Sequence, residues 1–596
     1  MEKQFEELFI KYREEEKLLK GQHSRVSFLR LFSAIVCILF FWSVFADKGG
    51  AFYFIGGMLS LGLFIYLIVV HKKISEKLTY VSNMAIVNEK YMKRIKWEWF
   101  DFEDIGEEFT DEENPYTSDL DIFGERSLFQ LINITNSFFG RKKLASLLNG
   151  KNKEKNQIEL RQGAVKELSD KLTFSQEIEC VGLNNFGIVK EQEELLKYLQ
   201  ESKCIFKNKS IRIIFYLVPF ATISSFLYAS TFNMDLLFVP TLLLVLHGIL
   251  LMIGNMGRFS ILKKINKFKG AVESYYKLIN IIENSEFSDE YLKSLKVKFY
   301  DNNIKASQCF KDISKILDKI DARYNMIGFL CYNLLLLGDY HCAFLLDDWK
   351  EKYGDHVEEW FEIVGEFEAL ASLGVIVNIN EKVSFPNISN EEMILNGESI
   401  GHILINPEDR ICNEIKLDQN IFVVTGSNMS GKTTFLRTIG INLVLAYAGA
   451  PVCAEKFNCS IMDIYTSMRI SDDLSNGIST FYAELKRIKI IIDSVKNKKP
   501  MIFFIDEIFR GTNSQDRILG AKSVLMTLNK SWIMGMISTH DFELCELNKY
   551  EKVKNYHFEE YYENDTIRFD YKVKQGICTT RNAKYLMKMV GIDIRE

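Results

Sequence analysis

Long apolar runs stand out in two parts of this 596-residue sequence. The four runs cover residues 28–46, 51–70, 211–230 and 236–253. Each is about as long as the ~20-residue helix that crosses the hydrocarbon core of a bilayer. One short polar turn joins the first run to the second, and another joins the third to the fourth. Buried core helices rarely occur in such pairs, so we predict two transmembrane helical hairpins, over residues 28–70 and 211–253.

Basic residues flank both hairpins at the ends away from the turns. Beside the first hairpin lie Arg25, Arg30, His71, Lys72, Lys73 and Lys77, whereas its turn carries only Lys48. Beside the second lie Lys203, Lys207, Lys209, Arg212, Arg258, Lys263 and Lys264, and its turn has no Lys or Arg. Because cytoplasmic flanks are enriched in Lys and Arg, we predict a multi-pass protein of the cell membrane. Both turns then face outwards, and the rest of the chain is cytoplasmic.

The remaining sequence changes its periodicity near Glu381. Before this point apolar residues mostly follow helical spacing, and after it short β-branched runs alternate with turns and glycines. We therefore predict an all-α lever and core region followed by an α/β domain. The predicted parts are an amino-terminal cytoplasmic helix (1–27), hairpin 1 (28–70), the first helical part (71–210), hairpin 2 (211–253), the second helical part (254–380) and the α/β domain (381–596).

Two stretches of the helical region need separate interpretation. The acidic stretch over residues 97–115 is typical of an exposed linker. The apolar stretch over residues 329–346 is nearly long enough to be a fifth span. Asp339, Tyr340 and His341 lie near its middle, which favours a buried core helix instead.

Composition adds little to this picture. The net charge is -5, so no global basic character indicates nucleic-acid binding, and any such contact needs a local patch. The eleven cysteines form no CxxC pair and no metal-ligand spacing, which argues against a zinc site or a disulfide framework. They fit a reducing cytoplasm.

The most specific chemical signal is FVVTGSNMSGKTTFLRTIG, over residues 422–440. A strand-like run ends at a glycine, and a second glycine five positions later is followed by Lys and Thr at the start of a helix. This is the spacing of a phosphate-binding loop. Glycine lets successive backbone N–H groups close around a phosphate, and the start of the helix adds its positive dipole end. The predicted ATP-binding residues are Gly426, Ser427, Asn428, Met429, Ser430, Gly431, Lys432, Thr433 and Thr434.

Two later strand ends complete the predicted site. The apolar run over residues 501–505 ends in Asp506 and Glu507. We expect Thr433 and Asp506 to hold Mg²⁺ and Glu507 to polarise the attacking water, while Lys432 contacts the outer phosphates. A further strand, over residues 532–538, leads to His540, which can reach the outer phosphate from the same sheet edge. The predicted catalytic residues are therefore Glu507, His540 and Lys432.

Four segments together resemble the ATPase domain of the MutS mismatch-repair family, a member of the ABC-type ATPase class. They are TGSNMSGKTTFLR, DDLSNGISTFYAEL, FFIDEIFRGTNSQDRILGA and STHDFEL. Upstream, GHILINPEDRICNEIKL is similar to the family's lead-in strand and turn, with Asn413 and Glu414 at the turn. GEFEALASLG, SLFQLINITNSFFGRKKLASLL and LRQGAVKEL resemble parts of its lever and core domains. The resemblance covers most of residues 118–190 and 324–591.

The resemblance implies roles that spacing alone does not give. It implies that Asn428 and Ser430 contact phosphates, and that Ser479 acts in trans on the nucleotide of a partner subunit. It also places Thr512 and Asn513 on a loop that crosses between subunits. A homodimer through the ATPase heads follows from this, and DNA is a partner implied by the family only.

Three departures from the family pattern change the expected function. The membrane hairpin occupies the place of the family's mismatch-reading module, and Phe5-Glu6-Glu7 matches that module's Phe-x-Glu pattern only by chance on a charged helix. The second hairpin interrupts the core domain. The sequence after KYLMKMVGI is too short for the family's terminal dimerisation element. Mismatch recognition by the usual route is therefore not expected.

We conclude that the sequence predicts an α/β P-loop NTPase head of the ABC-type, MutS-like class, on an all-α lever region with two transmembrane hairpins. The expected function is ATP hydrolysis at composite dimer sites with Mg²⁺, in a DNA repair-related role. The alternative is an ATP-driven, transport-related ABC-type membrane protein without DNA binding. Against it stand the few predicted spans and the Ser479-Thr480-Phe481 segment in place of an LSGGQ-type signature.

Overall fold

In a computed structural model of the protein, the chain folds into two compact units. The described residues are 2–46, 50–111, 114–150, 153–183, 189–200, 209–255, 260–301, 304–321, 324, 328–390, 393–427, 429–469, 480–509, 512–563 and 566–577. The amino-terminal unit comprises Met1–Lys93, Thr135–Gly140 and Lys171–Glu368. The carboxyl-terminal unit comprises Arg94–Ile134, Arg141–Asp170 and Ala369–Glu596. The six parts predicted from the sequence remain a prediction.

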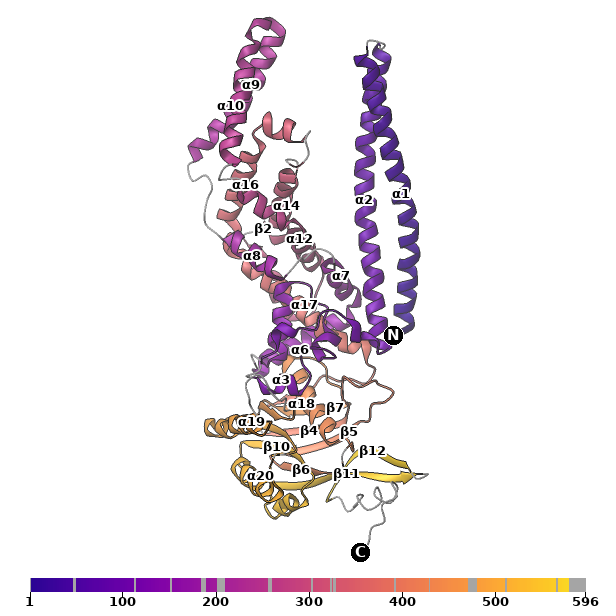
Figure 1. Ribbon diagram of the computed structural model, residues 1–596, viewed down its shortest axis with the longest axis vertical. Helices are drawn as coiled ribbons and strands as arrows, with labels where there is room; N and C mark the ends of the chain where they lie inside the picture. The colour runs from indigo at the N-terminus through magenta and orange to yellow at the C-terminus, as the bar shows by residue number, and fades with distance from the viewer. Residues whose placement is uncertain are drawn as a thin grey trace. The chain divides into compact units, whose positions relative to one another are not determined.

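Two unusually long helices begin the chain. α1 (Glu2–Phe45) and α2 (Ala51–Ile95) run side by side as an antiparallel pair (Figure 1). In their apolar halves, the buried Ser60 hydroxyl donates to the Ser33 carbonyl at 3.0 Å. Neither helix is interrupted at the predicted hairpin boundary, because no Pro or turn signal separates the polar half of each helix from its apolar half.

A second apolar pair consists of α9 (Lys209–Phe232) and α10 (Phe238–Asn255), joined through the short 3₁₀ turn η3 (Met234–Leu237). Across the pair, the Thr222 hydroxyl lies 3.2 Å from Nε2 of His247, whose Nδ1 lies 2.7 Å from the Leu334 carbonyl. Within the described residues, four helices are long and apolar enough to cross a membrane, and they are these two and the first two of the chain.

The apolar stretch 329–346 is not the single core helix expected from the sequence. A π-helical segment, η5 (Phe329–Leu334), is followed by Leu337 in the left-handed region at φ 53°. A new helix, α16 (Gly338–Tyr353), begins directly afterwards. The Asn333 side chain accepts from the Asp339 backbone N–H at 2.8 Å, which satisfies one donor at the start of α16.

The rest of the amino-terminal unit is a helical layer. Its elements are α7 (Leu172–Gly182), α8 (Val189–Gln200), α11 (Ser260–Lys267), α12 (Lys269–Asn284), α13 (Glu290–Val297), α14 (Ala306–Asp321), η6 (Gly354–His356) and α17 (Val357–Ile379), with the small strand pair β1 (Tyr300–Asp301) and β2 (Ile304–Lys305). Aromatic side chains fill its core. The fully buried Tyr275 of α12 stacks on Phe361 of α17 with ring centroids 3.7 Å apart, and Phe310 of α14 packs beside both.

A six-stranded sheet organises the carboxyl-terminal unit. Its order is β12 (Thr566–Gln575), β11 (Val553–Glu563), β6 (Ile421–Thr425), β10 (Ile533–Thr539), β9 (Met501–Asp506) and β8 (Asp463–Ser467). All neighbours pair in parallel except β12, which is antiparallel to β11. The central strands β6, β9 and β10 are buried at every position, as their unbroken apolar runs require in a parallel sheet covered on both faces.

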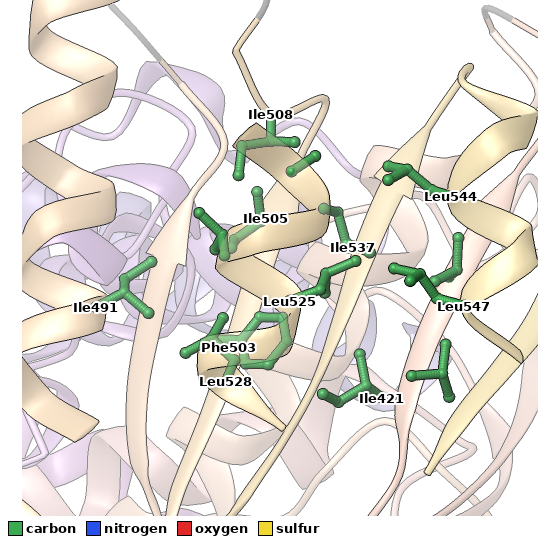
Figure 2. Packing of buried hydrophobic residues seen from close by; sticks show 14 of the residues in the cluster. Ile421, Ile491, Phe503, Ile505, Ile508, Leu525, Leu528, Ile537, Leu544 and Leu547 are labelled. Carbon is green, nitrogen blue, oxygen red and sulfur yellow. The ribbon is translucent and has the colours of Figure 1, made fainter. Parts of the chain in front are cut away.

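Helices cover this sheet and leave its carboxyl edge open. They are α18 (Lys432–Ala448), α19 (Thr480–Ser494), η7 (Val495–Asn497), α20 (Ser514–Leu528) and η8 (Phe542–Lys549). Figure 2 shows Ile421, Phe503 and Ile537 of the sheet packed with side chains of these helices. Ile491 of α19, Leu525 of α20 and Leu544 of η8 contribute to this cluster, in which almost every side chain is fully buried.

A second sheet has four strands, three of which precede β6 in the sequence while the fourth follows α18. Its order is β3 (Asn387–Ser389), β7 (Lys456–Ser460), β4 (Ile394–Ile400) and β5 (Asn413–Asp418). The same unit includes η1 (Trp99–Asp101), η2 (Glu107–Phe109), α3 (Pro115–Asp119), α4 (Leu128–Ile132) and α6 (Lys155–Asp170), while α5 (Phe138–Leu148) begins in the other unit. Arg161 of α6 donates to the carbonyls of Tyr447 and Ala448 at 2.9 Å each, which ties α6 to the end of α18.

The acidic stretch 97–115 is not an exposed linker, in contrast to the prediction. Trp99 is fully buried, and the amide of Gln130 donates to the carbonyls of Phe100 and Phe102 at 3.1 and 2.8 Å. Asp104 pairs with both guanidinium arms of Arg141 at 2.8 and 2.7 Å. The density of charged residues predicted an exposed segment, but the aromatic residues between the charges hold the segment in place.

Candidate functional site

The glycine-framed loop connects the end of β6 to the start of α18. Gly431 caps the helix with φ 103°, a left-handed conformation that favours glycine. A Cβ at this position would lie 3.1 Å from Cδ1 of Tyr571, and one at Gly426 would lie 2.8 Å from Oγ of Ser430. The loop therefore needs both glycines for its path. It places the backbone N–H groups of the first turn of α18 at the carboxyl edge of the sheet.

Lys432 is turned back onto this loop. Its buried ammonium group donates to the carbonyls of Gly426 and Ser427 at 2.9 and 2.8 Å and lies 3.5 Å from Nε2 of His540. The Ser430 hydroxyl is buried nearby and has no hydrogen-bond partner among the residues that the structure describes. A buried hydroxyl without a partner costs free energy, so a bound group with acceptor oxygens would satisfy it.

Oxygen donors converge beside the first turn of α18. The Thr433 hydroxyl donates to Asp506 at 3.0 Å, and the Ser538 hydroxyl donates to the other oxygen of the same carboxylate. Hydroxyl and carboxylate oxygens suit Mg²⁺, which usually takes one or two protein ligands together with substrate phosphates and water. Accordingly, no group of three His, Cys, Asp or Glu among the described residues could hold a metal by itself. The donors present fit a magnesium ion that arrives with a phosphate.

Glu507 directly follows Asp506, the last residue of β9, and its side chain lies beside the end of β10. Glu507 has φ 49°, in the left-handed region that is costly for a residue with a side chain. Its carboxylate lies 2.6 Å from Nε2 of His540, which follows the end of β10. Arg517 of α20 holds the adjacent Asp541 through two hydrogen bonds of 2.8 and 2.6 Å. Glu507, His540 and Arg517 together line a small cavity of about 230 Å³.

The loop also lines a larger cavity, of about 530 Å³. The loop residues Met429 to Thr434 and Glu507 line one part of it, including the predicted Thr434. The other walls come from His402, Ile405, Ile411, Asn413, Phe558 and Tyr571. This size lies within the range of small-molecule sites. The cavity is open to a ligand that also reaches the loop.

Most of these wall residues could not be assigned from the sequence. Asn413 was visible only as part of a lead-in turn; it bonds the Tyr571 carbonyl at 3.0 Å and the Val573 N–H at 2.9 Å, which fixes β12 beside the loop. His402 is buried, and its Nδ1 accepts from the Leu404 N–H at 3.2 Å. Burial and the nearby guanidinium groups of Arg437 and Arg410 lower the pKa of His402 to about 3.

A buried carboxylate that sequence reasoning missed lies at the end of α3. Asp119 has no exposed surface and accepts from the Thr466 hydroxyl at 2.7 Å, the backbone N–H groups of Met468 and Arg469 at 3.0 and 2.9 Å, and the Arg487 guanidinium at 2.9 Å. The two flanks of the segment 470–479 therefore meet at this one side chain. No local signal in the sequence singles out Asp119, because Thr117, Ser118 and Asp121 around it are polar as well.

A neighbouring carboxylate extends this network to α18. Asp121 accepts from Arg437 at 3.0 Å and from both arms of Arg469. Arg437 lies one turn after Thr433 on the same helix. The phosphate-loop helix and the chain that enters segment 470–479 are thus held by adjacent carboxylates.

Several other predicted residues lie outside the described residues or make contacts elsewhere. Asn428 and Ser479 lie outside the described residues. The Ser427 hydroxyl donates to Glu560, and Met429 is exposed. Asn513 caps α20, its side chain accepting from the Asp516 N–H at 2.9 Å. The predicted role of Asn513 between subunits therefore remains a prediction.

Comparison with known proteins finds a family match for the carboxyl-terminal domain. The MutS domain V profile matches residues 422–593. The chain is 28% identical over 256 residues to the DNA mismatch repair protein MutS of Thermosipho melanesiensis, an alignment that covers 42% of this chain and 31% of that protein. The chain thus matches about a third of the length of this relative. These two matches support a relationship of this chain to the MutS family, carried by its carboxyl-terminal domain.

Proposed function

We propose that this protein is a membrane-anchored, MutS-like ATPase that binds ATP with Mg²⁺ and hydrolyses it at composite sites in a dimer. The observation that carries the proposal is the convergence of Lys432, Thr433, Asp506, Glu507 and His540 at one sheet edge. Such an edge of a parallel sheet is the usual place for a nucleotide. The α/β unit is then a P-loop NTPase head of the ABC-type class.

The contacts give each side chain a task. When phosphate enters, Lys432 exchanges two loop carbonyls for phosphate oxygens, and the free Ser430 hydroxyl gains an acceptor. Thr433 and Asp506 would hold Mg²⁺, which would supply positive charge against the charge that develops on the phosphates. Glu507 orients the attacking water, and His540, already 2.6 Å from that carboxylate, senses the outer phosphate.

The nucleotide loop supports the phosphates, and the adjoining cavity fits the nucleoside. The cavity of about 530 Å³ reaches from Lys432 to aromatic and aliphatic walls such as Phe558 and Ile411. Apolar walls with few polar groups suit a nucleobase. Ser479 of the partner subunit completes the site in this proposal, which makes the homodimer the active form.

Membrane anchoring forms the second half of the proposal. It rests on four helices whose length and composition suffice for crossing a bilayer. Both hairpins cross the cell membrane with their turns outside, and the ATPase head faces the cytoplasm where ATP is available. DNA binding and a repair-related role come from the family, whose named relative is a DNA mismatch repair protein.

Replacement of Glu507 tests the chemistry directly. Glu507→Gln should retain ATP binding while turnover falls by about 10²- to 10⁴-fold, because the base that orients water is lost. Lys432→Ala should instead weaken ATP binding by about tenfold or more, because a charged hydrogen-bond donor is removed. Both are measured on the detergent-purified full chain, by ATP turnover and by binding of a fluorescent ATP analogue.

A matched control is Glu543→Gln, which removes a carboxylate just beyond His540 and Asp541 on η8, outside the predicted set. It should leave turnover unchanged. Wild-type turnover in Glu507→Gln would show that another group activates the water, and the role assigned to this carboxylate would then be wrong.

A transport-related ABC-type function without DNA binding is the second candidate, because the same chain carries candidate membrane spans, although four are few for a transporter. The two functions differ in what stimulates hydrolysis. A DNA-acting enzyme changes its ATP turnover when duplex, mismatched or branched DNA is added in detergent. A DNA-independent membrane enzyme keeps one rate with all of them and responds to reconstitution into lipid instead.

A further inference from the structure

A cluster of basic side chains lies between α1 and α2. The rings of His23 on α1 and His71 on α2 face each other with centroids 4.3 Å apart. Nε2 of His71 lies 3.0 Å from the Ser27 hydroxyl, and its Nδ1 lies 3.5 Å from the Arg30 guanidinium. These four side chains are partly exposed, so a ligand can reach them from outside.

This cluster has no counter-charge of its own. Among the described residues, no carboxylate bonds to His23, Arg30 or His71, and the nearest ion pair on α2 joins Lys72 to Glu76 one turn further on. A guanidinium and two imidazoles held this closely repel one another whenever the rings are protonated. An anion bound between them would offset that repulsion and accept hydrogen bonds from all of them.

An apolar surface begins immediately beside the cluster. Phe28, Leu31 and Phe32 follow on α1, and their side chains are 69%, 61% and 58% exposed. A small soluble anion does not cover such an apolar surface. A phospholipid does, because its phosphate and its acyl chains occupy neighbouring polar and apolar layers. Basic pockets between helices on the cytoplasmic side of a membrane are known to suit anionic headgroups.

We propose that Ser27, Arg30 and His71, together with His23, bind the phosphate of an anionic phospholipid. Arg30 supplies a planar fork of donors, Ser27 a hydroxyl donor, and the imidazoles further donors when protonated. The lipid chains lie along Phe28 and Phe32. This site rests on the proposed insertion of hairpin 1, and it fixes the depth at which α1 and α2 enter the membrane.

The test uses the full chain in nanodiscs of phosphatidylcholine that contain a minor fraction of phosphatidylglycerol. Lipids that remain bound are counted by native mass spectrometry, as the ratio of phosphatidylglycerol to phosphatidylcholine. Arg30→Gln should lower this enrichment by about tenfold, as expected for one charge-assisted hydrogen-bond donor. His71→Gln should lower it in the same direction, and Arg30→Lys, which keeps the charge, should retain most of it.

Arg25→Gln is the matched control, because it removes the same charge from an exposed position of α1 outside the cluster. It should leave the enrichment nearly unchanged. An equal loss in Arg25→Gln and Arg30→Gln would indicate general attraction to the surface and overturn the site. Unchanged ATP turnover and helicity in all four variants shows that they fold.

Two further measurements distinguish a lipid site from a soluble-anion site and from a failure of membrane insertion. Inorganic phosphate is added to protein in pure phosphatidylcholine nanodiscs. If it raises the thermal unfolding midpoint through Arg30 while phosphatidylglycerol is not enriched, the ligand is a soluble anion and the lipid site is wrong. Carbonate extraction of membranes reports insertion itself: release of the protein would overturn the proposed anchoring, whereas retention without enrichment overturns only the lipid site.

Discussion

His402 is a base that its surroundings keep neutral. It lies buried beside the cavity of about 530 Å³. Burial is the main cause that lowers its pKa to about 3, and the nearby charges of Arg437 and Arg410 lower it as well. Its Nδ1 acts as an acceptor for the Leu404 N–H, a role that requires the unprotonated nitrogen. The sequence offered no reason to single out this histidine, because its effect depends on two arginines that are close only after folding.

The stability of the protein should therefore depend on His402 below neutral pH. An unfolded histidine binds a proton near pH 6.5, whereas the folded one resists protonation down to about pH 3. Stability is complete above pH 6.5 and is lost as the pH falls, by about 2 kcal/mol at pH 5. His402→Asn keeps an acceptor but does not titrate, so its thermal unfolding midpoint should fall less between pH 7 and pH 5. Parallel pH profiles of the two proteins would contradict this role.

At the scale of elements, Asp119 joins parts that are distant in the sequence. It holds the end of β8 through backbone N–H groups and the middle of α19 through Arg487, and Asp121 nearby holds α18 through Arg437. Four donors are satisfied by one buried carboxylate. Because these partners are interdependent, the loss of one side chain affects all of them.

Asp119→Ala should loosen the carboxyl end of β8. The Met468 and Arg469 amides lose their acceptor and Arg487 is left without its carboxylate, so exchange of these two amide hydrogens should accelerate by about tenfold or more. Hydrogen exchange with mass spectrometry measures this. The Asp463 amide at the other end of β8 bonds the Pro500 carbonyl at 2.9 Å and serves as the internal control. Unchanged protection of residues 468–469 would show that the strand is held by other means.

The sequence could predict features that depend on neighbouring residues, but not those that depend on contacts between residues far apart in the chain. The phosphate-loop residues and the acidic pair Asp506-Glu507 follow from local spacing, and the structure brings Lys432, Thr433, Asp506, Glu507 and His540 together. Asp119 and Tyr571 could not be found in this way, because their partners are more than a hundred residues away. The stretch 97–115 was misread for a related reason, because Trp99 becomes buried and Asp104 meets Arg141 only in the folded chain.

At the scale of the whole molecule, the proposed activity depends on two chains. In the proposed composite site, each nucleotide is held by Lys432 of one chain and completed by Ser479 of the other. Closed two-fold symmetry then gives two such sites per dimer. The proposed confinement of the chains to a membrane would raise their effective concentration and favour this pairing.

Mixed dimers test the shared site. Lys432→Ala and Ser479→Ala chains each form inactive homodimers, but a mixed dimer has one site with both residues intact. Random mixing should restore about a quarter of wild-type ATP turnover, because half of the dimers are mixed and each has one of two sites. Two affinity tags confirm that mixed dimers form. If they form without any recovery, each head hydrolyses ATP alone.

The unbroken helix α2 has a mechanical consequence. Between the end of its apolar run at residue 70 and its last residue, Ile95, it continues for about 37 Å at 1.5 Å per residue. It therefore acts as a spacer whose length and rotational phase are linked: one inserted residue turns the far end by about 100° while adding only ~1.5 Å. The pairing of α1 with α2, from Glu16 with Ser82 to His23 with His71, fixes that phase. Changes in the length of this helix pair should therefore be tolerated only in both helices at once and in steps near whole numbers of turns, such as seven residues.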